Sequence, residues 1–211
     1  MKDSKSKGRR LAPARRAEVK ALVSIPADVV LSPQTERPRG PLGTDRSLPG
    51  KGSRIKEMTW AEFDRHVQAL GQRVQKGWGK DVQDAAVVGV AHGGVFVGGA
   101  VASALRCEFF PVRISRRSRD RGAGSSPKLF GEMPKELKGR RVLIVDDVAA
   151  SGDTLQLAQQ LARKVGAREV QTAALVQRPD GFVPDHVALV TADFLVFPWD
   201  YDMVEDQRFR P

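Results

Sequence analysis

One stretch decides the fold of this chain: Arg141-Val-Leu-Ile-Val-Asp146-Asp147-Val-Ala-Ala150-Ser151-Gly152-Asp153-Thr154. Its four apolar residues, Val142 to Val145, form a short continuous run that is typical of a central parallel strand covered on both faces. Two carboxylates follow, and then a turn of small and hydroxyl residues leads into a helix. The free N–H groups of a helix start attract phosphate, while the two acids can bind ribose hydroxyls and a hydrated Mg²⁺. The stretch therefore predicts a site for both ends of a ribose phosphate.

Strands and helices alternate along the chain on both sides of this stretch. We expect strands at residues 86–91, 108–114, 142–146, 169–176, 187–190 and 194–197. We expect helices from Thr59, from Gly93 to Leu105 and from about Thr154 to Val165. Pro111 indicates an edge or an irregular position in its strand. The alternation predicts an α/β fold, with a central parallel sheet flanked by helices and ligands outside the carboxyl ends of the strands.

Two of the predicted helices have recognisable ends and faces. Thr59-Trp-Ala-Glu62 reads as a capping box at the start of the first helix. Apolar residues then recur at helical spacing and are expected to form core, namely Trp60, Phe63, Val67, Leu70 and Val74. In the third helix Leu157, Leu161 and Val165 are expected to face inward, with Gly166 capping the end.

Further motifs occur in a fixed order around the central stretch. They are Thr59-Trp60, Ala91-His92-Gly93-Gly94, Arg178-Pro179-Asp180-Gly181 and Phe194-Leu195-Val196-Phe197-Pro198-Trp199-Asp200. With these motifs the chain resembles the type I phosphoribosyltransferases over roughly residues 55–204, and especially the xanthine-guanine and hypoxanthine enzymes of purine salvage. The resemblance implies a type I phosphoribosyltransferase-like fold with a mobile basic lid and a small hood. It also implies a Mg²⁺-dependent glycosyltransferase that moves 5-phosphoribosyl from phosphoribosyl pyrophosphate to a purine or purine-like base.

The resemblance assigns expected roles to residues of this chain. Asp146 and Asp147 are the expected catalytic pair. The phosphoribosyl pyrophosphate loop is Ala150, Ser151, Gly152, Asp153 and Thr154. Pyrophosphate is expected at His92, Gly93 and Gly94 and at the lid residues Arg116 and Arg117. The base is expected at Arg178, Phe194 and Leu195, and the metal at Asp147 and Asp200.

Three positions depart from the family pattern. His92 stands where the family has Arg or Lys, so its charge would depend on pH. Arg178 replaces a Lys and spreads its donors more widely, which indicates a differently shaped base pocket. Ala150 replaces the general base of 6-oxopurine enzymes, as in the adenine-specific branch.

Simpler explanations stay open for several of these residues. His92 could be a neutral turn residue, Phe194 could be ordinary core, and the lid arginines could be solvated. The acid pair could be a helix cap or part of a salt bridge, and Asp153 could be an exposed first-turn acid.

Charge is concentrated at the start of the chain. The net charge is +10, and residues 1–54 hold 13 Lys/Arg against 5 Asp/Glu. Their Pro- and Gly-containing composition predicts a flexible arm, and residues 55–211 then form the phosphoribosyltransferase domain. An alternative function is a catalytically weak regulatory protein that binds phosphoribosyl pyrophosphate or nucleotides and contacts nucleic acid through this arm.

The composition of the chain also indicates its expected cellular location. Cys107 is the single cysteine, so no intramolecular disulfide can form, and a reducing cytoplasm is the expected location. No apolar run approaches the roughly 18 to 20 residues that span a bilayer, so no membrane partner is expected. The resemblance implies a homodimer.

Overall fold

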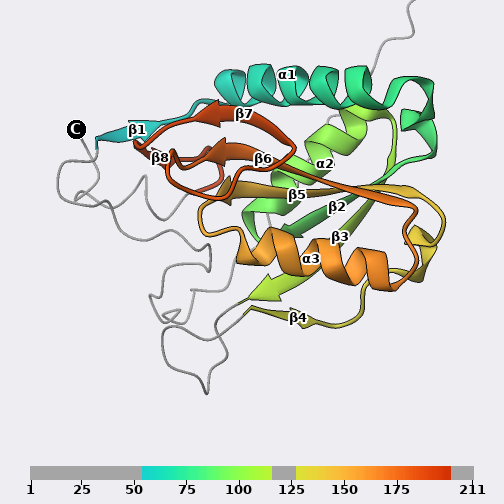
Figure 1. The fold of residues 1–211 in the computed structure, drawn as a ribbon. Coiled ribbons are helices and arrows are strands. Elements are labelled where there is room, and N and C mark those ends of the chain that lie inside the picture. The colour runs from blue at the N-terminus through green and yellow to red at the C-terminus, as the bar shows by residue number, and fades with distance from the viewer. Residues whose placement is uncertain (1–53, 116–126, 201–211) are drawn as a thin grey trace, which may run out of the picture. The chain divides into compact units, whose positions relative to one another are not determined.

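The structure, a computed structural model, describes residues 54–115 and 127–200. Its main sheet has six strands in the order β4-β3-β2-β5-β6-β7. Their bounds are β2 Ala86–Ala91, β3 Glu108–Ser115, β4 Lys128–Phe130, β5 Arg141–Ala149, β6 Glu169–Gln177 and β7 His186–Val190. All neighbouring strands pair in parallel except β4, which runs antiparallel to β3. The predicted α/β fold is confirmed (Figure 1).

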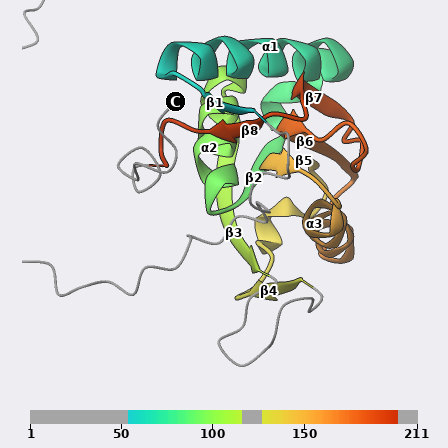
Figure 2. The same ribbon diagram turned by 90° about the vertical axis from the view of Figure 1, so that its left-hand side faces the viewer.

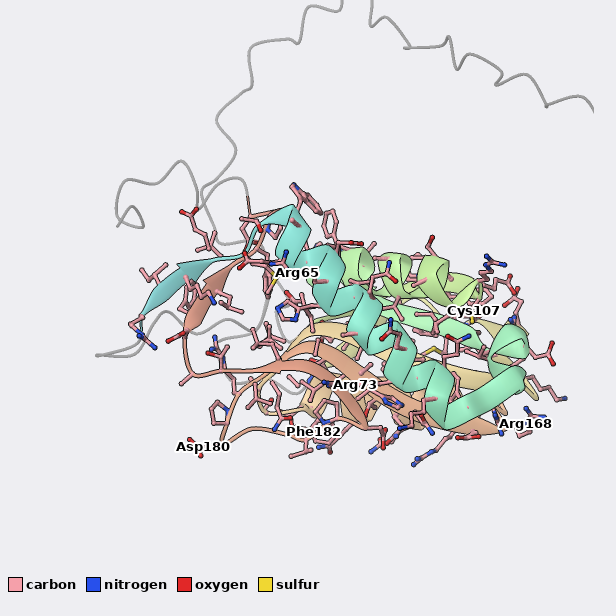
Figure 3. All side chains as sticks on the ribbon, turned by 90° about the horizontal axis from the view of Figure 1, so that it is seen from above. Arg65, Arg73, Cys107, Arg168, Asp180 and Phe182 are labelled. Atoms are coloured by element: carbon pink, nitrogen blue, oxygen red, sulfur yellow. The ribbon has the colours of Figure 1, made fainter. Side chains whose placement is uncertain are left out.

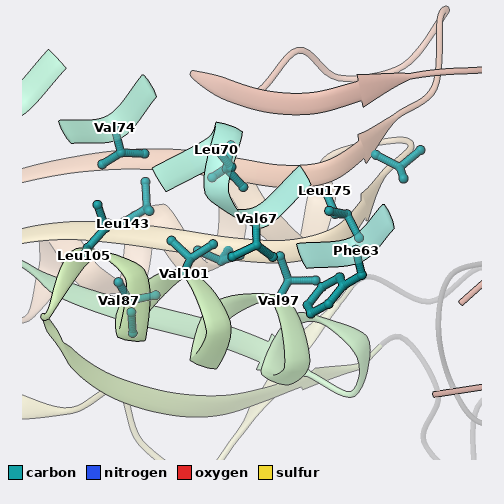
Figure 4. Close-up of a cluster of buried hydrophobic side chains, with 14 of the residues drawn as sticks. Phe63, Val67, Leu70, Val74, Val87, Val97, Val101, Leu105, Leu143 and Leu175 are labelled. Carbon is teal, nitrogen blue, oxygen red and sulfur yellow. The ribbon is translucent and has the colours of Figure 1, made fainter. Parts of the chain in front are cut away.

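Three helices cover the two faces of this sheet. They are α1 (Trp60–Trp78), α2 (Gly93–Leu105) and α3 (Asp153–Lys164), with short 3-10 turns η1 (Gly79–Asp84) and η2 (Lys135–Leu137). One core lies between α1, α2 and the sheet and includes Leu70, Val101 and Leu143 (Figure 4). A second core lies under α3 and includes Leu155 and Ile144. Because β5 contributes side chains to both cores, its apolar run is buried on both faces, as its sequence predicts.

The first helix begins at the predicted capping box. The Thr59 hydroxyl accepts a hydrogen bond from the Glu62 N–H at 3.2 Å, and the Thr59 N–H donates to the Glu62 carboxylate at 2.9 Å. The Thr59 N–H and the Thr59 hydroxyl both donate to the Glu62 carboxylate and hold the pKa of Glu62 below its usual value, with the backbone N–H as the largest cause. The expected core stripe is buried except for Trp60, which is 52% exposed. The prediction for Trp60 is wrong because the residue occupies the first helical position, where the helix has only begun to meet the core.

The third helix ends as expected, but the residues that it buries most deeply against the sheet are not the expected ones. The Gly166 N–H donates to the Arg163 carbonyl at 3.0 Å and the Ala167 N–H to the Ala162 carbonyl at 3.1 Å, while Gly166 has a φ of +95°. This pattern is a Schellman motif. The fully buried side chains are Leu155, Ala158 and Ala162. The predicted inward residues Leu157, Leu161 and Val165 are only partly buried, because the small alanines take the line closest to the sheet.

Two short strands form a separate small sheet. β1 (Ile55–Glu57) pairs in parallel with β8 (Phe194–Val196). This pair lies beyond the carboxyl ends of the main strands, at the left of Figure 1 and nearest the viewer in Figure 2. The segment expected as a strand at residues 194–197 is therefore a strand, but it does not join the main sheet.

The edge position expected for Pro111 has a structural basis. β4 pairs with β3 only at Arg113, Ile114 and Ser115. Pro111 pairs with Gly89 of β2 on its other side, so among the described strands none bonds the outer edge of β3 at the proline.

No helix in residues 54–115 and 127–200 is long and apolar enough to cross a membrane. The lid with Arg116 and Arg117 lies outside the described residues, as does the arm apart from Arg54. The hood stays a prediction.

Candidate active site

The acid pair lies in the middle of the main sheet. β5 continues through Asp146 and Asp147 to Ala149, three residues beyond the strand end expected from the sequence. The reason is pairing with β6, which accompanies β5 as far as the pair Ala149 and Gln177. The pairing of β2 with β5 stops earlier, at Gly89 and Val145. Both acids therefore lie where the pairing of β5 with β2 has stopped and its pairing with β6 continues.

This place is a switch point of the sheet. β2 is followed by α2 on one face, and its neighbour β5 is followed by α3 on the other face. In open α/β sheets, the crevice that opens between two such strands is where ligands bind.

The two carboxylates receive backbone hydrogen bonds. The Asp147 N–H donates to Asp146 Oδ1 and the Val148 N–H donates to Asp147 Oδ1, each at 2.9 Å. Asp147 is only 3% exposed, while Asp146 is partly buried. A buried carboxylate is costly unless hydrogen bonds or a cation engage it, and the Val148 N–H supplies one such hydrogen bond to Asp147.

The glycine turn lies directly against the acids. A β-carbon at Gly93 would overlap the carboxylate of Asp147, and one at Gly94 would lie 2.7 Å from the Val145 carbonyl oxygen and 3.1 Å from Asp146 Oδ1. Only glycine permits this approach at both positions. The structure thus brings together the predicted pyrophosphate turn and the predicted catalytic pair.

The residue before this turn is accessible. The peptide bond between Ala91 and His92 is cis. His92 is exposed at the start of α2, and its carbonyl accepts a hydrogen bond from the Val95 N–H at 3.1 Å. Its side chain therefore lies at the surface, next to the glycine turn, rather than in the core.

The phosphate loop follows the strand on the α3 side. Ala150 is partly buried, Ser151 is exposed and Gly152 is buried with a φ of +81°. α3 begins at Asp153, which is exposed in the first turn, and Thr154 is partly buried. The first N–H groups of an α-helix have no partner within the helix, so this loop presents donors next to the acids.

The residues expected to hold the base are engaged within the protein. Arg178 Nη1 donates to the carbonyls of Asp193 and Thr191, the latter at 3.3 Å, and so holds the connection between β7 and β8. Phe194 is 3% exposed and Leu195 is 4% exposed in β8. A base could reach the ring of Phe194 only if this segment moved.

Asp200 closes its own turn after β8. Its carboxylate accepts a hydrogen bond from the Phe197 N–H at 2.8 Å, and its N–H donates to the Phe197 carbonyl at 2.9 Å. Within the described residues, no three or more His, Cys, Asp or Glu side chains gather as a metal site. A metal site that joins Asp147 and Asp200 therefore stays a prediction.

Sequence reasoning missed two features near this site. Phe182 packs on Gly152 of the phosphate loop. Trp199 stacks between Phe96, at 4.9 Å and 2°, and Phe197, at 4.8 Å and 14°. Phe182 and Gly152 are far apart in the chain, as are Phe96 and Trp199, so no local pattern could have revealed those two contacts.

The fold and the switch point define an α/β protein with a mostly parallel sheet, the class in which ligands bind at the carboxyl ends of the strands. The model of the phosphoribosyl transferase domain matches residues 60–206, and the chain belongs to this family.

Curated relatives include two adenine phosphoribosyltransferases. That of Desulfosudis oleivorans is 34% identical over 101 residues, which cover 44% of this chain and 58% of the relative. That of Dinoroseobacter shibae is 34% identical over 107 residues, covering 47% and 60%. The chain thus spans little more than half the length of the curated relatives it matches.

Solved structures show the same fold over more of the chain. The purine phosphoribosyltransferase of Pyrococcus horikoshii has a TM-score of 0.60 and 29% identity, covering 69% of this chain and 93% of that one. The xanthine-guanine-hypoxanthine phosphoribosyltransferase of Helicobacter pylori has a TM-score of 0.57 at 18% identity, covering 71% and 96%. The second likeness concerns the fold alone.

Proposed function

We propose that this chain transfers a 5-phosphoribosyl group from phosphoribosyl pyrophosphate to a purine base, giving a nucleoside monophosphate and pyrophosphate. The observation that carries the proposal is the packing of Gly93 and Gly94 against Asp146 and Asp147 at the switch point of the sheet. The names of the Desulfosudis oleivorans and Pyrococcus horikoshii relatives support it. The alternative of a regulatory nucleotide-binding protein is not favoured by these relatives.

Each part of the donor substrate has a matching part of the crevice. The 5-phosphate would bind the N–H groups at the start of α3, from Ser151 to Thr154. The ribose hydroxyls would bind the carboxylates of Asp146 and Asp147. The pyrophosphate would bind the glycine turn, where the backbone can approach an anion closely, and the side chain of His92.

The reaction needs charge stabilisation more than covalent chemistry. The bond between the anomeric carbon and the pyrophosphate oxygen breaks, and a bond from a base nitrogen to that carbon forms. Positive charge develops on the ribose, and two fixed carboxylates beside it would stabilise the transition state. The attacking ring nitrogen gives up its proton to the departing pyrophosphate or to solvent, because Ala150 has no group to accept it.

Mg²⁺ fits the donor chemistry of this site. It prefers oxygen ligands and is usually held by one or two carboxylates plus substrate phosphates and water. We propose Asp147 and its neighbour Asp146 as the protein ligands, and Asp200 as a candidate at a second ion. When bound, Mg²⁺ would offset the charge of the departing pyrophosphate.

Adenine is the acceptor that we propose first. A 6-oxopurine enzyme would need a general base at the position of Ala150, and alanine cannot supply one. The adenine phosphoribosyltransferases among the relatives agree with this choice. On the base side, Arg178, Phe194 and Leu195 stay proposals.

Other features of the family remain proposals for this chain. They are the basic lid with Arg116 and Arg117, the homodimer, the cytoplasmic location and the domain boundary near residue 54.

A direct assay tests the function. The full chain is incubated with phosphoribosyl pyrophosphate and Mg²⁺ together with adenine, guanine, hypoxanthine or xanthine, and pyrophosphate and nucleoside monophosphate are measured. We expect product with adenine, and silence with all four bases would remove the proposal. The matched variants are Asp147→Asn, expected to lose about 100-fold in kcat/KM, and Asp64→Asn at an exposed position of α1, expected to change nothing.

A further inference from the structure

The turn Arg178–Phe182 lies against the chain that enters the phosphate loop. The Arg178 N–H donates to the Ala149 carbonyl at 3.0 Å, and the Phe182 N–H donates to the Ala150 carbonyl at 2.7 Å. The Gly181 N–H closes the turn on the Arg178 carbonyl at 3.0 Å. The two carbonyls directly before Ser151 are therefore both held by this turn.

The side chain of Phe182 makes a second contact with the loop. A β-carbon at Gly152 would overlap Cβ and Cγ of Phe182 and lie 2.7 Å from its Cδ2. Phe182 thus fills the space that a side chain at position 152 would need. It also packs against the buried cluster that contains Leu155 and Ala158 of α3.

This contact bears on a residue with a restricted backbone. Gly152 has a φ of +81°, a conformation that other residues adopt at a cost. Its carbonyl accepts the first hydrogen bond of α3, from the Gln156 N–H at 2.9 Å. Gly152 makes no side-chain hydrogen bond to the start of the helix. The backbone conformation at Gly152 therefore determines the direction of the first N–H groups of α3.

We infer that Phe182 is a positioning residue, which holds Gly152 and the start of α3 in the arrangement that binds the 5-phosphate of the donor. The inference rests on the proposed function for the identity of this ligand. The geometry does not depend on the proposed function: two backbone hydrogen bonds and one aromatic contact join the turn to the phosphate loop. In Figure 3, Asp180 lies at one side of the domain, Arg168 lies at the other, and Phe182 lies between them.

The test compares three variants of the full chain. Phe182→Ala removes the ring, Phe182→Leu keeps an apolar side chain of similar reach, and Val183→Ala changes the adjacent residue, which is 70% exposed. The readouts are the dissociation constant for phosphoribosyl pyrophosphate with Mg²⁺, the KM values for donor and base, and amide hydrogen exchange of residues 150–157.

We expect Phe182→Ala to weaken donor binding about tenfold, because a misplaced loop loses part of its contacts with the phosphate. The KM for the base should change far less, Phe182→Leu should recover most of the loss, and Val183→Ala should match the parent. Equal losses for donor and base, or unchanged donor affinity with only a lower melting temperature, would overturn the inference.

Hydrogen exchange separates this inference from the proposed function. If the parent chain binds no phosphoribosyl pyrophosphate, the proposed function fails. The positioning role still predicts faster exchange of residues 150–157 in Phe182→Ala but not in Val183→Ala, because loop order then depends on the ring. Unchanged exchange of this segment in Phe182→Ala would overturn it.

Discussion

Gly93 lies against Asp147 so closely that a β-carbon at position 93 would overlap the carboxylate and come within 2.9 Å of the Asp147 β-carbon. The turn that starts α2 and the acid pair of β5 therefore pack directly against each other, although they are far apart in sequence. A change in either one displaces the other.

The first prediction concerns this contact. Gly93→Ala should lower kcat/KM about 100-fold, because displacing a carboxylate by about 1 Å can cost that much in rate. Steady-state kinetics and thermal unfolding check it. The control is Gly99→Ala in the same helix, where a β-carbon would meet only Phe109 Cε1, at 4.0 Å. This change should leave activity intact and stabilise the helix by about 0.5–1 kcal/mol. Normal kinetics for Gly93→Ala would contradict the coupling.

The second prediction concerns the choice of base. Ala150→Asp should add a group that accepts the ring proton of a 6-oxopurine, an effect typically worth about 10² to 10⁴ in rate. Activity with hypoxanthine relative to adenine should then rise by at least about tenfold. An asparagine at position 150 is nearly the same size as an aspartate but cannot accept the proton. Ala150→Asn should therefore leave the ratio of hypoxanthine to adenine activity unchanged. If both variants shift the ratio alike, pocket size rather than proton acceptance selects the base.

The third prediction concerns Arg178. Its Nη1 holds the carbonyls of Thr191 and Asp193, and a lysine cannot reproduce the fixed geometry of a guanidinium. Arg178→Lys should raise the KM for the base several-fold and leave the KM for the donor unchanged. Arg168→Lys, at an exposed position, is the matched control. An equal rise in both KM values for Arg178→Lys would show that the residue acts on the whole crevice.

The fourth prediction concerns pH and stability. Burial lowers the pKa of His186, whose Nε2 lies 2.7 Å from Gln171 Oε1; Arg73 lowers that pKa further, and Asp185 opposes the shift. The unfolded chain binds a proton here more readily than the folded chain. This contribution to stability is therefore complete above the ordinary histidine pKa of about 6.5 and is lost as the pH falls below it.

Denaturant unfolding at about pH 7.5 and about pH 5.5 measures this effect. His186→Gln should reduce the loss of stability on acidification. The pKa of His66 is also lowered by burial, so His66 should still cause part of the loss of stability on acidification in the His186→Gln variant. The same loss in parent and variant would mean that His186 does not contribute.

Local patterns predicted the parts of the fold that local physics controls. The capping box at Thr59, the buried run before Asp146 and the positive φ at Gly166 each depend on a few neighbouring residues. Such features are readable because hydrogen bonding and conformational preference act over one turn.

The parts that could not be predicted depend on contacts between distant segments. β5 extends past its expected end because β6 lies beside it. Trp60 shares the helical spacing of the core residues but remains exposed, since spacing fixes a face and not the depth of burial. Arg178 bonds Asp193 because the connection between β7 and β8 passes beside the end of β6, which no single segment encodes.

The pairing of β1 with β8 also fixes how much of the chain a working fragment must contain. Ile55 pairs with Phe194, and the Met58 N–H donates to the Val196 carbonyl at 2.9 Å. A recombinant fragment cut at residue 60, where the family match begins, would leave the backbone of β8 exposed at an open edge that favours aggregation. During synthesis, β1 emerges long before its partner, so this small sheet can close only after almost the whole domain has left the ribosome.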